Sequence, residues 1–238
     1  MFSCIGCSRK RNNINIMFDK NIRLFELNQQ RINQFERYIM SSEDEDEQDM
    51  ISSIPLLKQM NNLWFFTLDS QGGNKNNFVQ DGIQYTIDQR SYVIGFMPKV
   101  VYMKIKNNIE SCENIIVNKM DVNTIKEEVE LTRVKKINES GNIENSIQTT
   151  YPGPISQEVL DNYLDMFHFV EPEAYGGGVE GLILDPDEWV GVFIADNRWN
   201  YHSTSENSAF KCIINALKNV IRAPKKGGKY KHTKKRRS

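Results

Sequence analysis

Six side chains able to move protons or attack a carbonyl lie close together in the C-terminal half of the chain. They are two serines, a histidine and three carboxylates: Asp187, Glu188, Asp196, His202, Ser203 and Ser205. Nucleophilic catalysis uses such a set, because the histidine takes the serine proton while the carboxylate orients the imidazole. The chemistry to consider first is therefore a hydrolase-type site at Asp196, His202 and Ser203.

The same residues also suit caps and turns. His202 adjoins Ser203 in sequence, and the chain has no G-x-S-x-G turn of the kind that presents a serine nucleophile. Serine and aspartate commonly begin helices and shape turns. The sequence therefore favours a protein without catalytic activity, and the hydrolase stays as the alternative.

The histidines and cysteines match no common metal-site spacing. The chain has no HExxH motif and no Cys/His pair, and the Cys4-x-x-Cys7 pair has no second pair because Cys112 and Cys212 stand alone. We expect no metal and no cofactor, and free thiols in a reducing, intracellular setting. A further alternative is a peripheral membrane protein acylated at Cys4 and Cys7, since basic residues follow them. No signal peptide or transmembrane run is recognisable.

Charge is divided unevenly along the chain. Residues 222–238 hold nine of the 30 lysines and arginines and none of the 31 acids, which leaves 21 basic and 31 acidic residues in 1–221. A dense basic tail binds polyphosphate through counterion release without reading sequence. The predicted contacts to nucleic acid or to an acidic partner are Lys225, Lys226, Lys229, Tyr230, Lys231, Lys234, Lys235, Arg236 and Arg237.

Residues 179–222 must position the candidate catalytic set. The short apolar runs 182–184 and 190–194 are typical of buried strands. Ser203–Glu206 fits a capping box, and apolar residues then recur at helical spacing, which predicts a helix over 204–222. A second covering helix is predicted over 157–168.

Earlier elements complete the predicted domain. Ser53 and Pro55 open a short helix, Asp81-Gly82 is a hairpin turn, and 99–109 fits either a helix or a strand. Strands are expected over 63–68, 78–79, 83–87, 92–97, 115–117, 127–137 and 143–149. The pattern predicts an α+β fold with a mixed or mainly antiparallel sheet covered by helices.

Composition divides the chain into five parts. An amphipathic helix over 15–40 either packs on the domain or pairs with another helix. The parts are a disordered cysteine-containing start (1–14), this helix (15–40), an acidic linker (41–51), the α+β domain (52–222) and a disordered basic tail (223–238).

Two segments carry a resemblance to a known group of proteins. The run IPLLKQMNNLWFFTLDSQGG, followed after a hairpin by QRSYVIGFMPK, and the tail KKGGKYKHTKKRRS lie within residues 54–99 and 225–238. Together they resemble uncharacterised proteins of large nucleocytoplasmic DNA viruses of algae and protists. The resemblance implies a viral origin, with the protein in host cytoplasm, nucleus or virion, and it implies no mechanism. We therefore expect a viral accessory or structural interaction protein whose tail contacts nucleic acid or an acidic partner.

Overall fold

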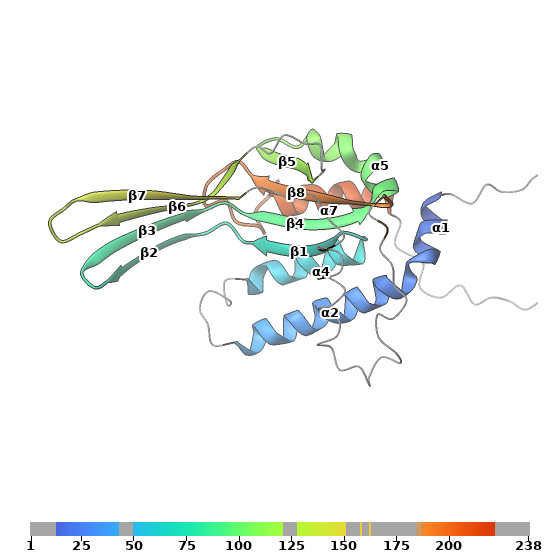
Figure 1. Cartoon of the computed structure of the whole chain (residues 1–238), viewed down its shortest axis with the longest axis horizontal. Coiled ribbons are helices and arrows are strands. Elements are labelled where there is room, and N and C mark those ends of the chain that lie inside the picture. Colours follow the sequence, from blue (N-terminus) through green and yellow to red (C-terminus); the bar gives the residue numbers. More distant parts are fainter. Residues whose placement is uncertain are drawn as a thin grey trace, which may run out of the picture.

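A computed structural model describes residues 13–42, 50–120, 128–150 and 187–221, with the single positions 158, 162 and 185. The described residues form an α+β fold with two four-stranded antiparallel sheets (Figure 1). The predicted fold class is confirmed. The predicted strand 182–184, most of helix 157–168, most of the acidic linker and both chain ends lie outside the described residues.

Helices and strands alternate in short blocks along the chain. The helices are α1 (Asn13–Lys20), α2 (Ile22–Ser41), the short η1 (Ile51–Ser53), α4 (Ile54–Asn62), α5 (Lys99–Glu110) and α7 (Ala209–Val220). The strands are β1 (Phe66–Gln71), β2 (Lys75–Gln80), β3 (Ile83–Gln89), β4 (Tyr92–Pro98), β5 (Ile115–Met120), β6 (Val129–Ile137), β7 (Ile143–Thr150) and β8 (Trp189–Asp196).

One long hairpin, residues 66–98, passes through both sheets. Its inner half joins the body sheet, with strand order β1-β4-β8-β5, and its outer half joins a sheet that we call the arm, with order β2-β3-β6-β7. The predicted turn Asp81-Gly82 connects the two sides, with positive φ at both residues (51° and 76°), as a type I′ turn requires. The arm projects away from the helices (Figure 1).

The hairpin bends between the two sheets at residues 72–74 and 90–91. At this bend Gly73 lies so close to another segment that a Cβ atom would be 2.3 Å from the carbonyl oxygen of Tyr201 and 2.8 Å from the backbone nitrogen of Ser91. Only glycine allows such an approach. The bend therefore depends on a contact between the hairpin and the segment that follows β8.

The core lies between the body sheet and its helices. β8 is buried along its whole length, and α4, α5 and α7 pack together with β4 and β8. Fully buried rings and aliphatic chains from sheet and helix meet there, including Phe66, Phe96, Phe210 and Leu217. Burying each such side chain contributes about 1.5–3 kcal/mol. Residues 99–109, which fitted either a helix or a strand, form α5.

The N-terminal helix is divided and packs on the body. Asn21 separates α1 from α2, and its side-chain amide donates to the carbonyl of Met17. Leu24 and Ile32 of α2 are buried, and the Phe25 ring stacks on Trp64 with centroids 4.8 Å apart. The apolar stripe of this segment therefore packs against the body of the same chain.

Strand β1 begins later than predicted. The N–H groups of Leu63, Trp64 and Phe65 donate to the last carbonyls of α4, so the chain turns before it can extend. Trp64 takes a φ of 63° in this turn. Three residues of the predicted strand 63–68 thus complete the end of a helix.

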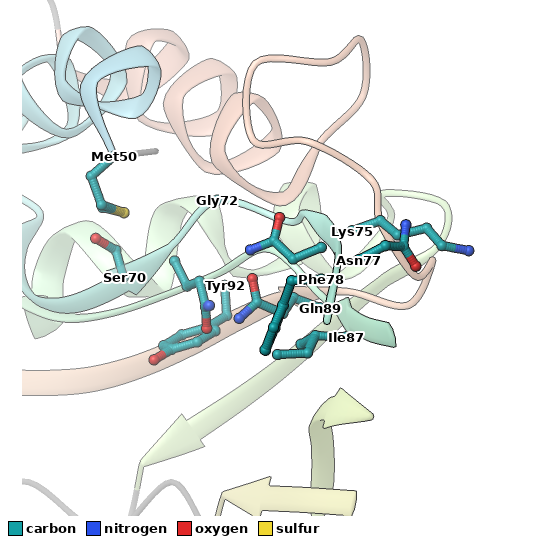
Figure 2. A pocket seen from close by; sticks show the side chains of 11 residues that line it. Met50, Ser70, Gly72, Lys75, Asn77, Phe78, Ile87, Gln89 and Tyr92 are labelled. Atoms are coloured by element: carbon teal, nitrogen blue, oxygen red, sulfur yellow. The ribbon is translucent and has the colours of Figure 1, made fainter. Parts of the chain in front are cut away.

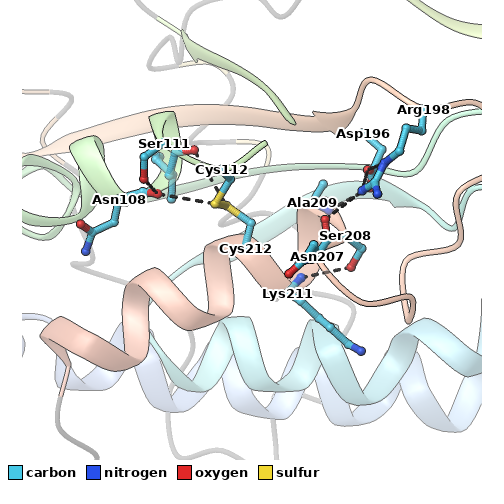
Figure 3. The surroundings of a disulfide bond; sticks show 11 residues. Asn108, Ser111, Cys112, Asp196, Arg198, Asn207, Ser208, Ala209, Lys211 and Cys212 are labelled. Carbon is cyan, nitrogen blue, oxygen red and sulfur yellow. Dashed lines mark hydrogen bonds and ion pairs between the residues drawn. A yellow bond between two sulfur atoms is a disulfide. The ribbon is translucent and has the colours of Figure 1, made fainter. Parts of the chain in front are cut away.

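Cys112 and Cys212 form a disulfide with their Cα atoms 6.4 Å apart (Figure 3). The expectation that both stand alone is wrong. α5 and α7 pack side by side and bring together two residues separated by 100 positions, a proximity that local sequence does not reveal. Disulfides are typical of proteins that fold in oxidising compartments.

Candidate functional site

The carboxylate of Asp196 is fully buried and holds three parts of the fold together. It accepts a hydrogen bond from Ser91 Oγ at 2.8 Å. It also accepts from Ala209 N at 2.8 Å and from Arg198 Nη2 and Nε at 2.6 and 3.2 Å (Figure 3). Ser91 is in the hairpin bend and Ala209 is the first residue of α7. Asp196 therefore fastens β8 to the bend and to the helix.

Asp196 also decides where α7 begins. The helix was predicted from Ser203–Glu206, but it starts at Ala209, with Ser208 as its N-cap accepting from Lys211 N at 3.3 Å. The predicted capping box is wrong, because the first helical N–H is taken by Asp196 and because Asn207, with a φ of 54°, cannot continue a helix backwards.

Ser203 and His202 have partners other than each other. Ser203 is fully buried, and its hydroxyl is 2.6 Å from that of Ser53. Nδ1 of His202 lies 3.2 Å from the backbone nitrogen of Thr204 and 2.8 Å from Thr204 Oγ1, and Nε2 lies 3.3 Å from Ser52 Oγ. Among the described contacts no hydrogen bond joins His202 to Asp196 or to Ser203, so the proton relay of a hydrolase is not assembled.

The other three candidates, Asp187, Glu188 and Ser205, also have structural partners. Glu188 pairs with Lys20 of α1 at 2.8 Å, a hydrogen bond that raises the pKa of the lysine. Asp187 is exposed, and its backbone N–H donates to Asp185 Oδ1. Ser205 N–H donates to the carbonyl of His202. All six residues have positions that shape or fasten the chain.

The segment 197–208 packs against the bend of the hairpin. Two guanidinium groups lie over the Trp199 ring, with the Arg90 Cζ atom 4.3 Å and the Arg133 Cζ atom 4.0 Å from the ring centroid. Burial and the like charge of Arg133 lower the pKa of Arg90. Asn200 adds a 2.6 Å hydrogen bond to Asp88 on β3. Aromatic and basic residues here hold the arm against the body.

A groove of about 910 Å³ lies where the arm leaves the body (Figure 2). Four amides, one charged side chain and two aromatic rings contribute to its lining, which comprises Met50, Ser70, Gln71, Gly72, Lys75, Asn76, Asn77, Phe78, Ile87, Gln89 and Tyr92. Amides offer both donors and acceptors and Lys75 adds one positive charge, so this lining suits a polar ligand such as a peptide segment.

Tyr92 forms one wall of the groove. Its hydroxyl donates to Asp69 Oδ2 at 2.9 Å. Burial, with the nearby Asp69 carboxylate, raises the pKa of the Tyr92 phenol well above its usual value. The ring therefore stays neutral and acts as a hydrogen-bonded wall.

The arm exposes apolar side chains on both of its faces. On one face Phe78 is 41% exposed and stacks on Tyr85 with centroids 4.9 Å apart. On the other face Val79, Ile143 and Ile147 are 71%, 58% and 52% exposed. Exposed apolar residues on a projecting sheet are typical of an interaction surface.

Sequence reasoning missed the groove. Its residues come from four strands, from Gly72 in the bend and from Met50. One signal in the sequence could have indicated the groove. Gly72-Gly73 interrupts the hairpin 66–98 between its two strand pairs, and such an interruption predicts a bend with a concave side.

Two other predicted sites lie in parts of the chain that the structure does not describe. The basic tail and the Cys4–Cys7 segment lie outside the described residues. Within the described part of the chain no cluster of three or more histidine, cysteine or acidic side chains is arranged to hold a metal ion, and no helix is long and apolar enough to cross a membrane. Neither a scan of protein-family models nor a search of curated proteins finds a match to this chain.

Proposed function

We propose that this is a non-enzymatic interaction protein, in which the basic tail binds nucleic acid or an acidic partner and the folded body presents the arm. The observation that carries the proposal is that the candidate catalytic residues make structural contacts. Asp196 and Ser203 are buried among structural partners, whereas the arm exposes Phe78, Val79 and Ile143. The candidate catalytic side chains stabilise the fold, whereas the exposed apolar side chains of the arm are suited to binding.

The division of charge supports nucleic acid as the partner of the tail. Residues 1–221 carry ten more acids than bases, so the body repels polyphosphate, while the tail carries nine bases and no acid. Binding would therefore be confined to residues 222–238, and the body would stay at a distance from the bound strand.

The resemblance to proteins of large nucleocytoplasmic DNA viruses extends the proposal to a viral accessory or structural role. Residues 54–99, which carry most of that resemblance, comprise α4 and the long hairpin that builds both body sheet and arm. The similar segment is thus the element that gives the chain its interaction surface.

The test is binding of the full chain to mixed-sequence DNA and RNA over a salt series. The comparison is with a full-length variant in which the nine tail lysines and arginines are glutamine. A control variant carries Lys99→Gln and Lys104→Gln, two exposed lysines of α5. We expect salt-sensitive binding, with a logarithmic slope of about −0.9 per phosphate contact on duplex DNA, that is lost in the tail variant and kept in the control. Binding that survives in the tail variant would refute the assignment to the tail.

A further inference from the structure

The outer edge of β2 has unused backbone hydrogen-bonding groups. Gln89 N–H donates to the carbonyl of Asn74, so the even-numbered residues of β2 face β3 and the odd-numbered ones point outward. Among the outward groups, Lys75 N–H is taken by Asn74 Oδ1 at 2.7 Å. The backbone N–H groups of Asn77 and Val79 have no partner among the described residues.

This edge lacks the features that usually block strand pairing. β2 has no proline, and its register with β3 runs without a bulge. Its one charged residue, Lys75, lies at the end next to the body, while Phe78 and Val79 are exposed near the tip. An unpaired edge without proline or a bulge is ready to accept another strand.

The sequence of β2 suits pairing with its own copy. In an antiparallel arrangement with Phe78 opposite Phe78 of a second copy, Asn77 lies opposite Val79 and Lys75 opposite Asp81. Outward groups then meet outward groups, as a hydrogen-bonded ladder requires. Because Tyr85 already stacks on Phe78, the two copies would form a row of four rings.

The groove matches the arm tip of such a second copy. In this register the tip of the second copy reaches Lys75, the one charged residue of the groove lining, which within one chain lies 3.7 Å from Asp88 Oδ1. The tip is acidic, because Glu139 lies against Gly82, beside Asp81. Groove and tip thus complement each other in charge at both ends of the same two-fold contact.

We propose that two copies of the chain associate by antiparallel pairing of β2 with β2, which joins both arms into one continuous sheet and seats each arm tip at the other copy's groove. This contact involves the arm and the groove and not the tail. Its test is therefore independent of whether the tail binds nucleic acid.

Sedimentation velocity on the full chain over a concentration series tests the proposal. Asn77→Pro removes one outward N–H and blocks close approach, while the backbone hydrogen bonds to β3 stay intact. The substitution also removes the 2.9 Å hydrogen bond that Thr86 Oγ1 of β3 donates to Asn77 Oδ1. The matched control is Asn145→Pro on β7, at the opposite edge of the arm, where Asn138 N–H donating to Asn142 O sets the odd-numbered residues outward. We expect a dimer for the wild type and Asn145→Pro, and association about 10- to 30-fold weaker for Asn77→Pro.

A second variant fixes the register and does not depend on proline. In a Cys4→Ser, Cys7→Ser background, Phe78→Cys should form an intermolecular disulfide with added diamide, because directly opposite Cβ atoms lie about 4.5–5.5 Å apart. Val79→Cys in the same background should crosslink far less, since Val79 faces Asn77. A monomeric wild type at every concentration, loss of association in Asn145→Pro instead of Asn77→Pro, or equal crosslinking by both cysteines would overturn the proposal.

Discussion

Replacing Asp196 with asparagine should destabilise the fold severely. The carboxylate is fully buried and accepts from a hydroxyl, a backbone N–H and a guanidinium. Asparagine keeps the shape but has one acceptor oxygen, and it turns an NH₂ group toward at least one of these donors. It also leaves the Arg198 guanidinium without its ion-pair partner.

The size of the effect follows from these contacts. Breaking a buried pair by removing one partner costs about 3–5 kcal/mol, and a hydrogen bond to a charged group contributes about 1.5–3 kcal/mol. With a urea m-value near the upper end of about 1–3 kcal/mol/M, the unfolding midpoint of Asp196→Asn should fall by about 1–2 M. Circular dichroism during urea titration of the full chain measures this shift.

Asp187→Asn is the matched control. Asp187 belongs to the same candidate catalytic set, but its side chain is exposed, so its substitution should change stability by less than about 0.5 kcal/mol. If Asp196→Asn unfolds at the same urea concentration as Asp187→Asn, the fastening role of Asp196 is refuted.

Two further predictions concern covalent and proton linkage. Reducing the Cys112–Cys212 bond, which spans 100 residues, should lower the free energy of unfolding by about 2–4 kcal/mol, and equal melting temperatures with and without reductant would contradict this. Because burial raises the pKa of Tyr92, the folded chain keeps a proton that the unfolded chain loses above about pH 10. Stability should therefore fall as the pH rises from about 9 to 11, and it should fall less steeply for Tyr92→Phe in urea titrations at each pH.

Local signals explain which elements the sequence predicts well. Asp81-Gly82 marks a hairpin because both positions need positive φ, and Ser53 with Pro55 marks the start of α4. The buried run 190–194 lies inside β8 as expected. Each of these features is determined by residues within a few positions of one another.

Long-range contacts explain the errors. The start of α7 depends on Asp196 accepting from Ala209, and the disulfide depends on the packing of α5 against α7. The division into body and arm depends on Gly73 meeting Tyr201. The sequence therefore shows the polar residues near β8 but not their hydrogen-bond partners. Those partners decide whether such a residue is structural or catalytic.

The arm and the last described residue before the tail lie at opposite ends of the molecule. Ile221, the last described residue before the tail, shares a pocket with Ile14 and Phe18, and α1 lies at the end of the body away from the arm (Figure 1). A dimer joined through β2 would therefore have its two Ile221 residues, after which the basic tails follow in the sequence, near its far ends. Each tail would bind phosphate weakly and with strong salt dependence, but two tails on one rigid dimer would act together through effective concentration. Asn77→Pro should then weaken binding to long DNA more than binding to short duplexes that one tail can fill, because only long DNA can engage both tails.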